Sequence, residues 1–137
     1  MIVQTYHVEQ DDYVNAGKAS SQVKMILKHF GIHPEKLRKM SVACYEAEIN
    51  MIIHSYGGQI VLSIEEDRII LKFMDTGPGI PDLQKAMEPG WSTANEKARD
   101  MGFGAGMGLV NIKRVSDFFE ITSSTEGTAL IVGFNMI

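Results

Sequence analysis

Apolar residues recur along the chain in two periods, one typical of strands and one typical of helices. Residues 2–8 (IVQTYHV) read as a short strand, and the following pair Asp11-Asp12 is a candidate helix cap. A helix is expected next, because apolar residues return every three or four positions, at Ala16, Ala19, Val23, Ile26, Leu27 and Phe30. Gly31 is expected to end it.

A second helix is predicted from Pro34, whose fixed φ suits a first helical turn, to about Ser55, before Gly57-Gly58. Its apolar stripe is expected to contain Val42, Tyr45, Ile49, Ile52, Ile53 and Tyr56. The β-rich runs 59–64 and 68–74 follow, and the acidic residues between them predict an antiparallel hairpin.

The second half of the chain begins with a polar stretch, residues 82–101, for which a short helix and then a mobile loop are expected. A glycine-rich run, residues 102–108, leads into a helix that carries Leu109, Ile112 and Val115. Two last strands, residues 118–123 and 128–134, flank a turn at Glu126-Gly127.

This order of elements predicts an α/β (α+β) two-layer sandwich, in which a mixed, mostly antiparallel sheet carries its helices on one face. A doubly wound parallel sheet would need helices that alternate with single strands, which the order excludes. The 137 residues fit one domain, residues 1–137.

Composition excludes several classes of function. The net charge is −4 and the basic residues do not cluster beyond Lys113-Arg114, which argues against nucleic-acid binding. Cys44 is the single cysteine, so no internal disulfide and no Cys/His metal spacing is possible. The sequence shows neither a signal peptide nor a membrane span, and we expect a cytoplasmic protein without a membrane partner.

Glu46 and Asn50 form the first constellation with chemical potential. At about 100° per residue, four positions bring their side chains to within about 40° of each other on the helix surface. They fall on the border of the apolar stripe, where an amide oxygen could ligate Mg²⁺ and a carboxylate could accept a proton. Glu48 is expected to point to solvent. The same spacing also occurs on solvated helices, so the pair alone is weak evidence.

The second constellation is the segment Asp75-Thr76-Gly77-Pro78-Gly79 at the end of a predicted strand. A buried carboxylate there could accept a hydrogen bond from the adenine amino group, and it would repel the carbonyl that guanine has at that position. Gly77 and Gly79 would let the backbone approach a purine or take a positive φ. The alternative is a plain turn, which uses the same residue types.

The third constellation is the glycine-rich run at residues 102–108. Glycines permit close approach to phosphates, and the helix that follows offers free amides and a partial positive charge. The alternative is a flexible linker, since a glycine motif alone is weak evidence. The ordered set of three constellations is what favours a nucleotide site.

On these motifs the chain resembles the GHKL (Bergerat-fold) ATPase superfamily. The resemblance assigns Glu46 and Asn50 to its N box and Gly127-Thr128 to a late motif whose hydroxyl helps to hold adenine. The matches to its two glycine boxes are Asp75, Gly77 and Gly79 in the first and Gly104, Gly106 and Gly108 in the second.

Within the superfamily, the segments CYEAEINMIIHSYGG and GMGLVNIKRVSDFFEI most resemble small bacterial anti-sigma regulatory factors and their serine/threonine protein kinase relatives. The resemblance implies ATP and Mg²⁺ as cofactors. It also implies phosphorylation of a Ser or Thr on a partner with a STAS fold, either an anti-sigma antagonist or a scaffold protein, in bacterial stress or sporulation-type regulation. Glu46 would be the base and Asn50 the Mg²⁺ ligand, while Ser92 and Thr93 would sit in a lid over the γ-phosphate.

Other interpretations of the same motifs are less well supported. A sensor histidine kinase needs a phosphoacceptor domain and gyrase- or chaperone-type ATPases need long extra domains, for which we expect no room here. The serious rival is a non-catalytic module that uses nucleotide to capture a sigma factor or to activate a phosphatase. The presence of both Glu46 and Asn50 favours the kinase. The identity of the partner and the existence of a homodimer stay open.

Overall fold

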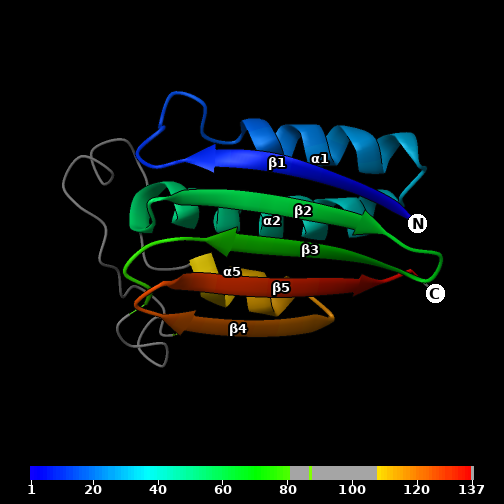
Figure 1. Ribbon diagram of the computed structural model, residues 1–137. Helices are drawn as coiled ribbons and strands as arrows, with labels where there is room; N and C mark the ends of the chain where they lie inside the picture. The colour runs from blue at the N-terminus through cyan, green and yellow to red at the C-terminus, as the bar shows by residue number, and fades with distance from the viewer. Residues whose placement is uncertain (81–86, 88–107, 137) are drawn as a thin grey trace.

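One antiparallel sheet forms the first layer of the protein (Figure 1). The computed structural model describes residues 1–80, 87 and 108–136. Its strands are β1 (Ile2–Glu9), β2 (Gly57–Ile64), β3 (Arg68–Asp75), β4 (Phe118–Ser124) and β5 (Gly127–Asn135). They lie in the order β1-β2-β3-β5-β4, and each neighbouring pair is antiparallel. The two-layer prediction is confirmed, and the described sheet is fully antiparallel rather than mixed.

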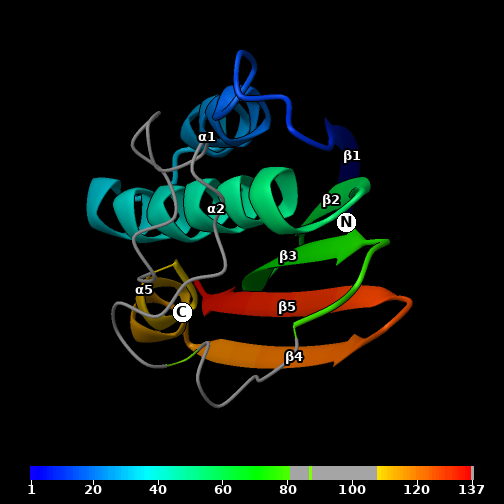
Figure 2. The ribbon, with the colours of Figure 1, turned by 90° about the vertical axis from the view of Figure 1, so that its left-hand side faces the viewer.

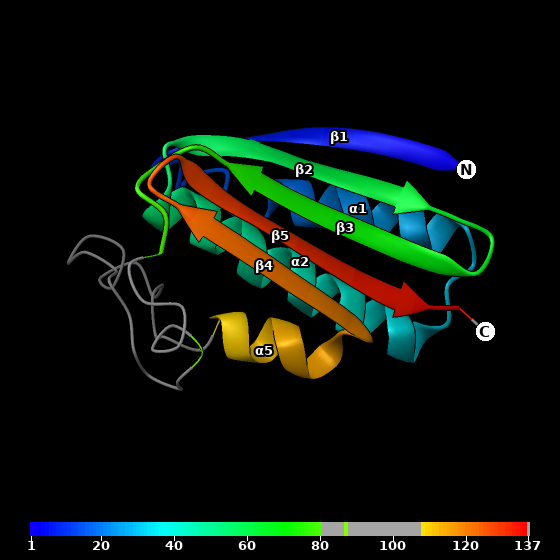
Figure 3. The ribbon, with the colours of Figure 1, turned by 60° about the horizontal axis from the view of Figure 1, so that its bottom comes forward.

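Three helices form the second layer, on a single face of the sheet (Figures 2 and 3). They are α1 (Lys18–His29), α2 (Pro34–His54) and α5 (Gly108–Val115). The central helix, α2, packs against α1 on one side and α5 on the other. Among the described helices, none has the length and apolar character that a membrane crossing requires.

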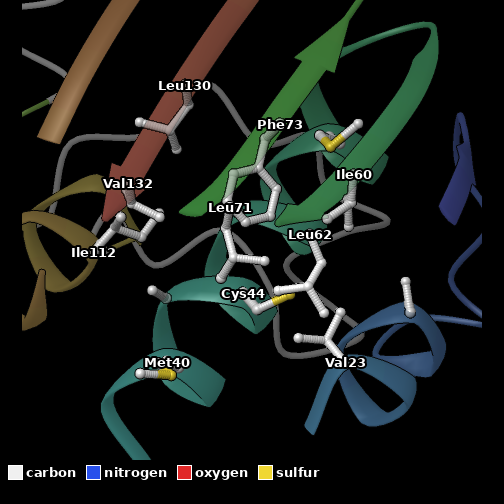
Figure 4. Close-up of a cluster of buried hydrophobic side chains, with 14 of the residues drawn as sticks. Val23, Met40, Cys44, Ile60, Leu62, Leu71, Phe73, Ile112, Leu130 and Val132 are labelled. Carbon is white, nitrogen blue, oxygen red and sulfur yellow. The ribbon is translucent and has the colours of Figure 1, made fainter. Parts of the chain in front are cut away.

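The core lies between the sheet and the helices (Figure 4). Cross-strand pairing places Leu62, Leu71 and Val132 in one row, and all three side chains are buried. Because side chains alternate between the two faces of a strand, the residues two positions away from this row point to the same, helix-bearing face. From the helix layer, the core contains Val23 of α1, Met40 and Cys44 of α2, and Ile112 of α5.

The predicted apolar stripe of α2 was only partly correct. Tyr45 is 40% exposed and Tyr56 is 63% exposed, although both were assigned to the stripe. The buried positions of α2 are instead Leu37, Met40, Ala43, Cys44, Ala47, Glu48, Ile49, Met51 and Ile52. A helix with neighbours on several sides is buried over more of its circumference than a surface helix, which buries a single stripe.

The prediction for Glu48 was wrong, because this side chain is 2% exposed. Its carboxylate accepts hydrogen bonds from the backbone amides of Gly17 (3.1 Å), Ala19 (3.4 Å) and Ser20 (2.9 Å), and from the Ser20 hydroxyl. These amides belong to the start of α1, where backbone donors lack partners within the helix and a negative charge is stabilised. Glu48 therefore caps α1 from the neighbouring helix.

The proposed cap Asp11-Asp12 was also wrong. The residue before α1 is Gly17, which makes no side-chain cap, and the first turn of α1 contains no acidic residue. Asp12 accepts hydrogen bonds from Asn15 instead. The local sequence therefore does not cap α1, and a carboxylate from another helix does so in its place.

Glu48→Ala should lower the free energy of unfolding by about 2–4 kcal/mol, because it leaves buried amide donors without an acceptor. Urea denaturation checks this. The matched control is Glu66→Ala in the exposed turn between β2 and β3, for which a change within about 0.5 kcal/mol is expected. Equal midpoints for the two variants would contradict the capping role.

Candidate functional site

The candidate site lies at the end of the sheet where β3 finishes and the β4–β5 turn begins (Figure 1, left). The C-terminal end of α2 and the first turn of α5 reach the same end of the molecule. Backbone hydrogen bonds join the segment after α2 to the turn after β3: the Tyr56 amide donates to the Thr76 carbonyl at 2.8 Å, and the Thr76 amide donates to the Gly57 carbonyl at 3.0 Å. The end of α2 is thereby fixed to the turn that follows β3.

Asp75 is the last residue of β3 and pairs with Gly58 of β2. Strand alternation places it on the helix-bearing face, two residues after the buried Phe73. One carboxylate oxygen, Oδ1, accepts the backbone amide of Thr128 at 3.0 Å. Burial raises the pKa of the Asp75 carboxyl above its usual value, and the amide of Thr128 opposes that rise.

The close packing around Asp75 depends on Gly127. Its φ is +148°, and a Cβ at this position would overlap the Asp75 carbonyl oxygen. Gly77, with φ +151°, passes close to the Ser55–Tyr56 backbone, and its amide donates to the Glu126 carbonyl at 3.3 Å. At both glycines the backbone therefore packs directly against a neighbouring backbone segment, and a side chain at either position would prevent this contact.

Thr128 also belongs to a small hydroxyl network. Its Oγ1 lies 2.8 Å from Ser123 Oγ, and the Ile80 amide donates to the same Ser123 oxygen at 2.7 Å. This network fixes the chain just after Gly79 to the β4–β5 hairpin. Ser123 was missed by the sequence analysis, although the predicted hairpin pairs it with Thr128.

Glu46 and Asn50 lie together on the side of α2 that faces α5. Gly108, the first residue of α5, is so close that a Cβ there would lie 2.9 Å from Asn50 Nδ2 and 3.1 Å from Oδ1. Both α2 side chains are half-buried. Burial raises the pKa of the Glu46 carboxyl above its usual value, and a side-chain hydrogen bond with Asn111 of α5 opposes the rise.

The sequence analysis also missed Asn111. It lies three positions after Gly108, so the two residues share one face of α5. This spacing was a usable signal, but only the packing of α5 against α2 shows that the shared face meets Glu46 and Asn50.

The structure brings the described site predictions together in two groups. The α2 pair meets Gly108, and Asp75 meets Thr128 through its backbone. Gly77 and Gly79 lie in the turn after Asp75. The other predicted site residues, Ser92, Thr93, Gly104 and Gly106, lie outside the described residues.

No group of three or more His, Cys, Asp or Glu side chains suited to a metal ion occurs among residues 1–80, 87 and 108–136. Mg²⁺ does not require such a cage, since it commonly keeps several waters and binds one or two protein oxygens together with substrate phosphates. The amide oxygen of Asn50 is a donor of the required type, next to the first turn of α5.

Comparison with known proteins finds similarity over most of the chain. A family model described as the histidine kinase-like ATPase domain matches residues 10–134. Serine/threonine-protein kinase RsbT of Bacillus subtilis is 32% identical over 110 residues, which cover 77% of each chain. Anti-sigma F factor of Caldanaerobacter subterraneus is 33% identical over 103 residues, 72% of this chain and 68% of that one. Anti-sigma F factor of Clostridium perfringens is 31% identical over 125 residues, 86% of each.

Gly127→Ala should destabilise the protein through the contact with the Asp75 carbonyl. The matched control is Gly31→Ala, since Gly31 has φ +75° and a Cβ added there would meet no atom within 4 Å. Gly31 lies close to the left-handed region that other residues can adopt, whereas φ +148° at Gly127 is adopted essentially by glycine alone, so the difference between the variants combines backbone strain with the steric contact. Urea denaturation should show a loss at least about 2 kcal/mol greater for Gly127→Ala. Equal losses of unfolding free energy would mean that the turn rearranges to accommodate the new Cβ and would contradict this prediction.

Proposed function

Because the chain belongs to the histidine kinase-like ATPase domain family, we propose that it is an ATP- and Mg²⁺-dependent serine/threonine protein kinase. Its substrate is a Ser or Thr hydroxyl on a partner protein with a STAS fold. The observation that carries the proposal is the position of Glu46, a half-buried carboxylate one turn from Asn50 and beside the start of α5. That placement suits a base next to bound phosphates.

The adenine would bind at Asp75. Oδ1 already accepts the Thr128 amide, and a carboxylate has a second acceptor oxygen for the adenine amino group. Guanine would present a carbonyl there, which an acceptor repels. The Thr128 hydroxyl, held 2.8 Å from Ser123 Oγ, would complete the purine contacts. Gly77 and Gly79 would let the backbone lie against the base.

The phosphates would lie between α2 and the first turn of α5. The amides at the start of a helix are free to bind anions, and the helix dipole favours negative charge there. We assign to Gly104, Gly106 and Gly108 the backbone contacts to phosphate, to Ser92 and Thr93 the contacts over the γ-phosphate, and to Asn50 the Mg²⁺. Bound Mg²⁺ would neutralise charge on the transferring phosphoryl group.

Glu46 would accept the proton of the attacking Ser or Thr hydroxyl. As that oxygen bonds to the γ-phosphorus, the bond from the γ-phosphorus to the β–γ bridging oxygen breaks and ADP leaves. The net effect of its surroundings is to raise the pKa of Glu46. A carboxylate with a raised pKa is a stronger base than an exposed one.

One observation supports a second candidate function. Relatives of this chain are named both as a kinase and as anti-sigma F factors, so a nucleotide-dependent module that captures a sigma factor, or activates a phosphatase, is the alternative. A pure binder would not need a base, and the environment of Glu46 therefore favours the kinase.

Two substitutions should separate catalysis from binding. Glu46→Gln should lower transfer from γ-labelled ATP to a STAS-domain protein by at least about 100-fold, with Mg·ATP affinity almost unchanged. Asp75→Asn should weaken ATP binding by about tenfold or more, because an amide replaces one acceptor oxygen with a donor. Transfer assays and calorimetry measure the two effects.

The matched controls for these variants are Glu66→Gln and Asp67→Asn, the same changes in the exposed β2–β3 turn. Neither should alter binding or transfer. Full transfer activity in Glu46→Gln would show that Glu46 is not the base. Unchanged ATP affinity in Asp75→Asn would move the adenine site elsewhere.

Gly108→Ala should selectively weaken the Mg²⁺-dependent part of ATP binding. The new methyl would displace the Asn50 amide, a flexible side-chain end, while alanine itself suits a helix. Affinity for ATP with Mg²⁺ should fall by about tenfold, and affinity in EDTA should fall less, because the loss of the Asn50 position adds to any effect on the Gly108 phosphate contact only when Mg²⁺ is present. Lys113→Ala on the exposed side of α5 is the control. An equal loss with and without Mg²⁺ would contradict the assignment of Asn50.

A further inference from the structure

Helices α2 and α5 contact each other through two matched positions. Gly108 lies against Asn50, and Asn111 hydrogen-bonds Glu46. Along α5 the chain runs from Gly108 to Asn111, whereas the matching positions on α2 run backwards, from Asn50 to Glu46. Each step is about one helical turn. A single turn of α5 is therefore aligned with the turn of α2 that carries both proposed catalytic groups.

In the hydrogen bond between Asn111 and Glu46, only one of the two side chains can be the donor. An ionised carboxylate can only accept hydrogen bonds, so the Asn111 amide must donate through Nδ2 to Glu46. An amide is neutral, and it supplies this donor without the strong pKa depression that an Arg or Lys beside the carboxylate would cause. Glu46 keeps its basicity while one of its oxygens is held in place.

Apolar side chains bury α5 in the fold. Leu109 and Ile112, at 8% and 0% exposure, anchor this helix in the core. Asn111 itself is half-buried and lies outside the arc between these two apolar residues, toward Glu46 of α2. A substitution at this position should therefore leave the packing of α5 largely intact, and its effects should appear at Glu46.

We propose that Asn111 is a positioning residue for phosphoryl transfer: it holds one oxygen of Glu46 so that the other faces the attacking hydroxyl. The proposal rests on the proposed kinase function. Because Asn111 and Gly108 share one turn, the base and the Asn50 side chain are set relative to each other by the same short segment of α5.

The test uses Asn111→Leu, which keeps the branching at Cγ and has no donor, and Asn111→Asp, which puts a second carboxylate beside Glu46. Transfer from γ-labelled ATP to a STAS-domain protein should show kcat lowered by at least about tenfold in both. Calorimetry should show Mg·ATP affinity within about twofold of the unaltered protein. The urea midpoint of Asn111→Leu should stay close to that of the control Lys113→Leu, on the exposed side of the same helix.

Unaltered kcat in Asn111→Leu, with an active parent protein, would overturn the positioning role and leave the kinase function standing. Equal losses of kcat, Mg·ATP affinity and stability would overturn it in favour of a structural role. A parent protein that binds Mg·ATP but transfers no phosphate to any STAS-domain protein would overturn the kinase function and this inference with it. A loss confined to kcat supports the proposal.

Discussion

The rest of the structure depends on the packing of α2 on three sides. Within little more than one turn, its residues meet three different neighbours: Cys44 packs in the core beneath the sheet, Glu48 caps α1, and Glu46 contacts α5. A helix shared in this way cannot rotate without breaking contacts on every side. Its fixed orientation is what places Glu46 and Asn50 at the junction with α5.

The adenine end of the candidate site depends on backbone geometry instead. The turn after β3 lies between the end of α2 and the β4–β5 hairpin, and hydrogen bonds from Tyr56 and Gly77 hold it on both sides. Gly79 and Gly127 both permit close backbone approaches between this turn and the hairpin. The two ends of the site thus have different origins, helix packing for the phosphates and strand-end turns for the base, and the segment 55–57 joins them.

The sequence predicted the fold well where its signals are local. Periodicity located each described strand and helix, and Pro34 marked the first residue of α2. Glu46, Asn50 and Asp75 were singled out because their motifs stand in order along the chain. In the structure Glu46 and Asn50 lie on the side of α2 that faces α5, and Asp75 is the last residue of β3. Their roles toward a nucleotide are proposals that rest on this placement and on the family.

The errors have a common physical cause. Glu48 was assigned to solvent because a helical stripe allows for one neighbour, whereas its partners are backbone amides about thirty positions earlier, at Gly17–Ser20, and a backbone amide leaves no mark in the sequence. Asp11-Asp12 seemed a cap because local capping is the common case. The positions of Asn111 and Ser123 relative to Gly108 and Thr128 are visible in the sequence. Only the packing of α5 against α2 and the pairing of β4 with β5 show that these positions bring the two side chains to the site.

The measurement that tests the central claim most directly is a calorimetric titration of the unaltered protein with ATP and with GTP, each with and without Mg²⁺. The account predicts that ATP binds, that Mg²⁺ strengthens its binding, and that GTP binds far more weakly because Asp75 accepts from adenine. Equal affinity for both nucleotides, or no binding of either, would contradict it.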